Sequence, residues 1–287
     1  MAKNGAGQPM KLDMGRAWND AMGLLSANFA VIATVLGLFY FLPQFAIALF
    51  APDASATAAP DLPPDASPEM VMEALNETFS AAYADIWPYI LLTAVLGYVG
   101  ALAVLALLRR EGNPTVGEAL KAGIIGTPSY FATQLLFGLG AGLFIVLPVA
   151  LVGAIAPIAA VLVGLLLVVV LVYAAFKLLL VPAVIGIEGD LNPFAVMARS
   201  WRLTKGNTLR IFTFVVLLFV VLIIVTIIVS LVAGLIFAAM GDEAVRIGGG
   251  FISALTNAAV GAIYLTVIAA IHRQLSGDRE RVIETFE

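Results

Sequence analysis

Long apolar runs separated by short polar segments dominate this chain of 287 residues. A helix that crosses a membrane needs about 20 predominantly apolar residues. Six runs reach that length, near residues 29–50, 87–108, 130–153, 157–185, 209–239 and 250–271. The pattern predicts an all-α integral membrane protein, with six transmembrane helices in one domain that covers residues 1–287.

Short amphipathic segments precede the first, third and fifth spans. In each, apolar residues recur in the i, i+3, i+4, i+7 pattern of one helix face. The three sets are Met14, Ala17, Trp18 and Ala21; Val116, Ala119, Leu120 and Gly123; and Phe194, Met197, Ala198 and Trp201. Helix-start signals accompany them, at Asp13, at Thr115 with Glu118, and at Asn192 with Pro193. We therefore expect three pseudo-repeated units, each a short amphipathic cytoplasmic helix followed by a transmembrane hairpin, in one bundle with a cytoplasmic collar.

The segment between the first two spans has two parts. Residues 51–67 are rich in proline, alanine and aspartate, which predicts a flexible outer linker. Ser67-Pro68-Glu69 then has the order of an N-cap, a first-turn proline and a first-turn acid, which predicts an outer amphipathic helix over 68–84. We favour a helix on the membrane surface with its acidic face in water. The alternative is an acidic docking site for a cationic partner.

Composition narrows the classes of function. Hydrophobic residues make up 62% of the chain and charged residues 12%, with a mean hydropathy of +1.04, which excludes an ordinary soluble domain. Cysteine is absent and His272 is the single histidine, which excludes disulfides, thiolate sites and a multi-histidine metal centre. No phosphate-binding loop and no nucleophile with a base is recognisable. We expect no catalytic, metal or cofactor site, and therefore no enzyme.

The distribution of lysine and arginine predicts the orientation. These residues lie before the first span, after the second and fourth spans and after the sixth, whereas the opposite loops contain only Arg246. The positive-inside rule therefore places both termini in the cytoplasm, including a tail over residues 274–287.

Lys177 is the one ionisable residue well inside a predicted span, and such residues are the first functional candidates. Three interpretations remain open: its side chain reaches the headgroups or contacts a phosphate, it forms a buried pair with an acid, or it serves transport. We expect Glu188 to pair with Arg199 or Arg202 on the following helix rather than with Lys177.

Other polar and small residues in the spans have simpler interpretations. Gln134 and Asn257 either form hydrogen bonds between helices or line a cavity, and His272 is expected at the membrane interface. Small residues predict close approaches between helices. These are Gly138, Gly140 and Gly142 in the third span, and Ala254, Ala258, Gly261 and Ala262 in the sixth.

The segment from Lys177 to Gly206 carries a family resemblance. Its ordered residues are Lys177, an apolar run, Pro182, Glu188, Pro193-Phe194-Ala195 and Arg199-Ser200-Trp201-Arg202-Leu203-Thr204-Lys205-Gly206. In this order they resemble the membrane domain attached to some glycerophosphodiester phosphodiesterases, and related stand-alone bacterial membrane proteins of unestablished role. The resemblance implies a six-helix module of the bacterial inner membrane, with Pro182, Glu188, Pro193, Ser200, Trp201 and Gly206 as its structural motif. Hydrolysis in the fused relatives belongs to a separate soluble barrel, for which this chain leaves no room, so we do not expect that activity.

Two functions follow as expectations. In the first, the protein binds, senses or moves a lipid or a small phosphate-bearing amphiphile, with Lys177, Arg199, Arg202 and Lys205 as the phosphate contacts. In the second, it is a scaffold or accessory subunit for another membrane or envelope protein, which docks through the collar or the outer acidic helix. Membrane lipids are the expected partners, and neither a cofactor nor a nucleic acid is expected.

The helix predicted over residues 193–205 is expected to lie flat at the cytoplasmic interface. Phe194, Met197 and Trp201 would then point into the bundle or the acyl boundary, and Arg199 and Arg202 would lie at headgroup level.

Topology reporters test the six-span prediction. A reporter fused after Ser67 is expected outside, and reporters after Asn113, Asn207 or Glu287 inside, because basic segments are retained in the cytoplasm. Protease protection or enzymatic reporters measure the side directly. A cytoplasmic signal after Ser67, or an external one at any other site, would refute the predicted arrangement.

Overall fold

The computed structural model describes residues 11–50, 66–109 and 114–284, and in these segments the chain is helical with no strand. The elements are α1 (Met14–Ala27), α2 (Phe29–Leu36), the π-helix η1 (Gly37–Phe41), α3 (Leu42–Phe50), α4 (Pro68–Leu107), α5 (Val116–Gly153), α6 (Pro157–Lys177), α7 (Val181–Ala183), the π-helix η3 (Val184–Glu188), α8 (Pro193–Leu203), α9 (Thr208–Ala238) and α10 (Asp242–Glu284). Six stretches are long and apolar enough to cross a membrane, so the all-α architecture with six candidate spans is confirmed. The predicted linker lies outside the described residues, except for residues 66 and 67.

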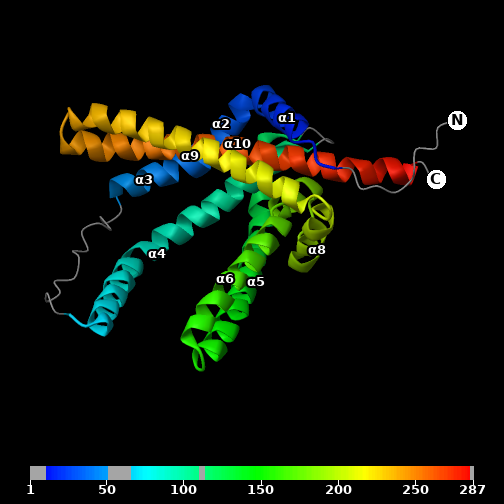
Figure 1. Cartoon of the computed structure of the whole chain (residues 1–287). Coiled ribbons are helices and arrows are strands. Elements are labelled where there is room, and N and C mark those ends of the chain that lie inside the picture. Colours follow the sequence, from blue (N-terminus) through cyan, green and yellow to red (C-terminus); the bar gives the residue numbers. More distant parts are fainter. Residues whose placement is uncertain (1–10, 51–65, 110–113, 285–287) are drawn as a thin grey trace.

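The spans diverge from one common region instead of running side by side as the single bundle that we expected (Figure 1). One arm is the antiparallel pair of α9 and α10 with α3 alongside, a second is α4, and a third is the pair of α5 and α6. The arms meet at a buried region that we call the hub, formed by residues 99–106, 180–185 and 265–272, with α1 and α8 packed on it. Burial is therefore concentrated at one end of the spans.

Two of the three predicted short helices are separate elements. Asp13 caps α1 by accepting a hydrogen bond from the Arg16 amide at 3.0 Å, and α1 buries Ala17 and Ala21. Asn192 caps α8, with Pro193 in its first turn. Both start signals thus act as the sequence predicted.

The second predicted short helix is not separate. Thr115 and Glu118 form the predicted capping box, but the helix that they begin continues without a break to Gly153 as α5. Likewise, the predicted outer helix over 68–84 begins at Ser67 as expected and then runs on through Pro88 into the second span, as α4. No helix-terminating turn follows either start, so each amphipathic segment extends its span. The threefold repeat is therefore not reproduced in the second unit.

The fourth predicted span is interrupted near its end. The α6 helix stops at Lys177, and a new short helix begins at Val181, with Pro182 in its first turn. Proline has no amide hydrogen and is tolerated in a first turn but not in a helix interior. The chain then forms η3 and ends it at Gly189, whose φ of 78° lies in the left-handed region that favours glycine. This break leaves Glu188 at a helix end that faces the hub.

A close approach between helices occurs at Gly261, as predicted, where a Cβ would lie 3.0 Å from Tyr40 Cε1, and others occur at glycines that were not predicted. A Cβ on Gly123 would lie 2.5 Å from the Val99 carbonyl oxygen, and one on Gly186 would lie 2.6 Å from Leu105 Cβ. Nothing lies within 4 Å of a Cβ built on Gly138, Gly140 or Gly142, so the prediction for the third span was wrong. These three glycines lie far along the α5 arm, beyond the hub where α4 and α5 meet.

Replacing Gly123 by alanine should destabilise the protein, because the new methyl group meets a backbone oxygen that cannot move independently. Overpacking of this kind costs about 1–3 kcal/mol. Gly138→Ala is the matched control on the same helix, with open space around the new methyl group. Thermal unfolding in detergent should show a lower midpoint for Gly123→Ala and an unchanged or higher one for Gly138→Ala. Equal midpoints would contradict the close packing of α4 on α5.

Candidate functional site

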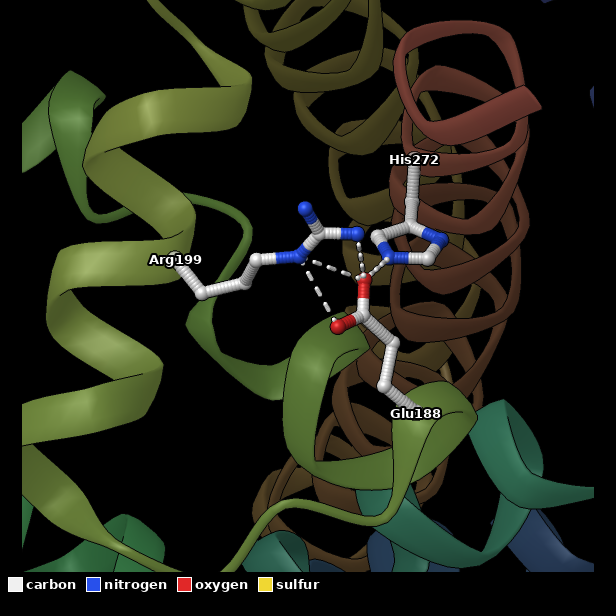
Figure 2. Close-up of polar contacts among 3 residues, drawn as sticks. All are labelled: Glu188, Arg199 and His272. Atoms are coloured by element: carbon white, nitrogen blue, oxygen red, sulfur yellow. Dashed lines mark hydrogen bonds and ion pairs between the residues drawn. The ribbon is translucent and has the colours of Figure 1, made fainter. Parts of the chain in front are cut away.

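The hub brings together an acid, an arginine and the single histidine of the chain (Figure 2). Glu188 ends η3, Arg199 lies in α8 and His272 lies in α10. Arg199 donates from Nη2 to Glu188 Oε1 at 3.0 Å and from Nε to Oε2 at 3.0 Å, and His272 Nε2 lies 2.8 Å from Oε1. We call these residues the Glu188 triad. One carboxylate thus joins three segments of the chain.

The triad is more enclosed than a surface ion pair. The side chains of Arg199 and Glu188 are 25% and 26% exposed, and that of His272 is 4% exposed. Partial burial strengthens a charge-assisted hydrogen bond and makes loss of one partner costly. The expected pairing of Glu188 with Arg199 is confirmed. His272 is buried in the hub, and its expected position at the depth of the membrane interface stays a prediction.

Local turn chemistry positions α8 against Glu188. The Asn192 amide donates to Asp190 Oδ1 at 3.0 Å, and Asn192 Oδ1 accepts from the Phe194 and Ala195 amides at 3.0 and 3.3 Å. These bonds close a short turn directly after Gly189 and begin α8 at once. Because the connection is short, the helix folds back beside η3, and Arg199 faces the carboxylate.

The face of α8 that meets the hub differs from the predicted stripe. Val196, Ser200 and Leu203 are buried, whereas Phe194 is 69% and Trp201 43% exposed. Phe194 and Trp201 therefore do not point into the bundle, and their expected alternative position at the acyl boundary stays a prediction. Ser200 explains the shift, since its hydroxyl donates to the Lys177 carbonyl at 2.8 Å and satisfies the C-terminal end of α6.

Lys177 is 3% exposed, so its neighbours cover nearly the whole side chain. Its ammonium lies 5.6 Å from the centre of the Tyr173 ring and 5.4 Å from that of the Trp201 ring, within the range of cation–π attraction. In the described part of the chain, Nζ forms no hydrogen bond and no ion pair. The interpretation as a buried pair with an acid therefore finds no partner in these residues. We call Lys177, Tyr173 and Trp201 the lysine cage.

The four candidate phosphate contacts do not form one cluster. Arg199 is engaged by Glu188, and Lys177 is enclosed by aromatic rings, whereas Arg202 and Lys205 are exposed at the end of α8. Gly206 follows with φ 83°, which lets the chain turn from α8 into α9. The exposed pair thus lies beside Trp201, one wall of the lysine cage.

Several basic residues have structural roles that the sequence did not indicate. Arg109 donates from Nε to the Gly186 carbonyl at 2.9 Å, Arg210 donates to the Leu12 carbonyl at 3.2 Å, and Arg273 donates to the Leu108 carbonyl. Leu108 caps α4 and Gly186 lies in η3, so two of these cations satisfy carbonyls at helix ends. The partners are 77 and 165 residues apart in sequence, so no local pattern could have revealed them.

His272 attaches α10 to the end of η3 through its ring. His272 Nε2 is bonded to Glu188, and Nδ1 is buried with no hydrogen-bond partner in the structure described. Both ring nitrogens are thus shielded from a substrate. Among the described residues, no group of three or more metal-ligating side chains forms a potential metal site.

Comparison of the chain with protein-family models, with curated proteins and with solved structures finds no match. The function proposed below is therefore based on the geometry of the hub and the properties of its residues.

Replacing Glu188 by glutamine should destabilise the protein. The change removes the charge that Arg199 and His272 share, and hydrogen bonds to charged groups are worth about 1.5–3 kcal/mol each. Arg202→Gln is the matched control, because Arg202 is exposed on the same helix as Arg199. Thermal unfolding in detergent should show a clearly lower midpoint for Glu188→Gln and a nearly unchanged midpoint for Arg202→Gln.

A double-mutant cycle isolates the ion pair. Arg199→Gln should lower the free energy of unfolding much less in the Glu188→Gln protein than in the unchanged protein, because its partner is already neutral there. Additive losses would show that the two side chains do not interact.

Proposed function

We propose that this chain is a non-enzymatic, multi-pass protein of the bacterial inner membrane that binds an anionic lipid, or another phosphate-bearing amphiphile, at the hub. The burial of Lys177 without a carboxylate partner among the described residues supports this proposal most strongly. A buried charge is costly unless it is paired, and cation–π contacts offset only part of that cost. A ligand phosphate beside the ammonium would complete the pairing.

The surroundings of the lysine cage favour this ligand. The two rings that flank the ammonium are themselves partly exposed, Tyr173 at 50% and Trp201 at 43%, so a rotation of either side chain opens the cage. Arg202 and Lys205 add exposed positive charge next to Trp201. With the orientation predicted by the positive-inside rule, this charge lies at the anionic inner leaflet.

Binding is the first step of both the sensing and the transport functions that the sequence allows. The resemblance of the segment from Lys177 to Gly206 to membrane domains of glycerophosphodiester phosphodiesterases agrees with a lipid-handling module. The scaffold function is the alternative. The exposed apolar arms do not favour it over lipid binding, because lipid covers such surfaces as well as a protein does.

Lipid binding is tested first at Lys177. Without lipid, Lys177→Gln should raise the unfolding midpoint in detergent, because a buried unpaired charge is removed. Phosphatidylglycerol should stabilise the unchanged protein by mass action but should stabilise the Lys177→Gln variant much less. Diacylglycerol, which lacks the phosphate, and soluble glycerol phosphate, which lacks the chains, distinguish headgroup binding, chain binding and binding of free phosphate.

Arg202 and Lys205 provide the second test of the proposal. Arg202→Gln with Lys205→Gln should weaken retention of phosphatidylglycerol in native mass spectrometry about thirtyfold, because each basic residue near an anionic surface contributes about 1 kcal/mol. Lys121→Gln, at an exposed lysine of α5, is the control and should change retention much less. Unchanged lipid retention in both the Lys177 variant and the double variant would reject the proposal and favour the scaffold function.

A further inference from the structure

A polar cavity lies within the candidate spans, and its lining contains no residue of the Glu188 triad or the lysine cage. It has a volume of about 150 Å³ and lies between η1 and α3 on one side and α4 and α10 on the others. Its polar lining consists of Tyr40, Gln44, Thr93, Tyr98 and Asn257. All five belong to segments that are long and apolar enough to cross a membrane.

The polar groups of this cavity are not satisfied by the protein. Among the described residues, the side-chain amides of Gln44 and Asn257 form no hydrogen bond, and neither do the hydroxyls of Tyr40 and Tyr98. Thr93 donates its hydroxyl to the Tyr89 carbonyl at 2.8 Å and keeps its oxygen as an acceptor. Polar groups that face hydrocarbon without partners cost several kcal/mol each. We therefore expect water or a polar ligand in this space.

A local irregularity in the first span shapes the cavity. The π-helix η1 interrupts the regular helix at Gly37–Phe41, and π-helical turns occur frequently at functional sites. It directs Phe39 and Tyr40 against neighbouring glycines. A Cβ on Gly100 of α4 would lie 2.6 Å from Phe39 Cβ, and one on Gly261 of α10 would lie 3.0 Å from Tyr40 Cε1. The two glycines allow the ring of Tyr40 to lie between α4 and α10, at the cavity wall.

The glycine at the cavity wall itself has a different environment. Gly97 lines the cavity, and nothing lies within 4 Å of a Cβ built on it. The wall thus leaves open space beside α4, whereas the positions that hold Phe39 and Tyr40 are tightly packed.

We infer that this cavity binds a small, uncharged molecule with several hydroxyl or amide groups. Among the residues that the structure describes, no acidic or basic side chain lines it, so a charged ligand would be left uncompensated at membrane depth. Two amides and two tyrosine hydroxyls offer both donors and acceptors, and the threonine oxygen adds an acceptor. The volume is roughly ten times the 10–15 Å³ that a single water needs, so a molecule of several heavy atoms fits.

An apolar groove on the other side of the first span provides a contrast. It has a volume of about 400 Å³, and its lining includes Ile32, Leu36, Phe251 and Leu255. Such a surface suits an acyl chain and offers no hydrogen bonds. Leu255 and Asn257 are two residues apart on α10, so the same helix presents an apolar surface to the groove and a polar one to the cavity.

The absence of cysteine from the chain makes single-cysteine labelling the direct test of hydration. In lipid nanodiscs, Gln44→Cys and Asn257→Cys should react with a small, uncharged, water-soluble methanethiosulfonate such as the hydroxyethyl reagent. Leu42→Cys and Leu255→Cys are the matched controls, because each lies two residues away and each leucine is 50% exposed. The cavity positions should react on the order of a hundredfold faster, because the reactive thiolate forms in water and is suppressed in apolar surroundings. Equal slow rates at all four positions would show a dry cavity and overturn the inference.

Ligand binding is measured at Gly97 of the cavity wall, because a substitution there removes no polar group. Gly97→Cys should be modified quickly, and erythritol or acetamide should slow that modification severalfold, whereas tetramethylammonium, a cation of similar size, should not. Adding Asn257→Leu to the Gly97→Cys protein should abolish the protection. Fast modification that neither neutral probe slows would reduce the cavity to a water-filled space and overturn the binding site. Protection by tetramethylammonium alone would overturn the assigned chemical class.

Discussion

The carboxylate of Glu188 is the interaction on which the hub depends. It accepts hydrogen bonds from α8 through Arg199 and lies within hydrogen-bond distance of His272 in α10, so a helix end in the middle of the chain is tied to the next helix and to one far away in sequence. The side chains are only partly exposed, which makes each contact stronger than a surface ion pair and the loss of one partner more costly. The position of α8 follows from this attachment. The position of Trp201, and with it the lysine cage, follows from α8.

The break after α6 is the second constraint, because a helix that ends inside an apolar region leaves carbonyls without partners. Ser200 donates to the Lys177 carbonyl, and Arg109 donates to the Gly186 carbonyl in η3. Ser200 and Arg109, which the sequence places in polar, basic segments, are therefore needed to satisfy backbone carbonyls. Basic residues of this chain thus have two roles, since the same charges that predict the orientation also complete helix ends in the hub.

Burial concentrated at the hub has a consequence for where ligands can bind. The arms diverge beyond it (Figure 1). Their apolar side chains are largely exposed in the structure. The lysine cage lies where the helices converge, and the polar cavity lies along the first arm, between η1 and α10. The two sites differ in chemistry, because one presents a cation beside aromatic rings and the other presents only neutral hydrogen-bonding groups. Occupancy of one site need not depend on the other.

Local sequence signals determined much of this protein. Apolar runs of sufficient length identified six candidate spans, and the cap residues Asp13, Ser67, Thr115 and Asn192 begin helices where expected, because both signals act within a few residues of the backbone. The pairing of Glu188 with Arg199 was also accessible, since only eleven residues separate them. Tertiary structure alone decided the rest. His272 is 84 residues from Glu188, Gly123 approaches α4 only because two helices cross there, and Trp201 is exposed because Ser200 is drawn to the end of another helix. A local pattern shows which residues share a helix face, but which face is buried depends on partners that the folded chain brings from far away in sequence.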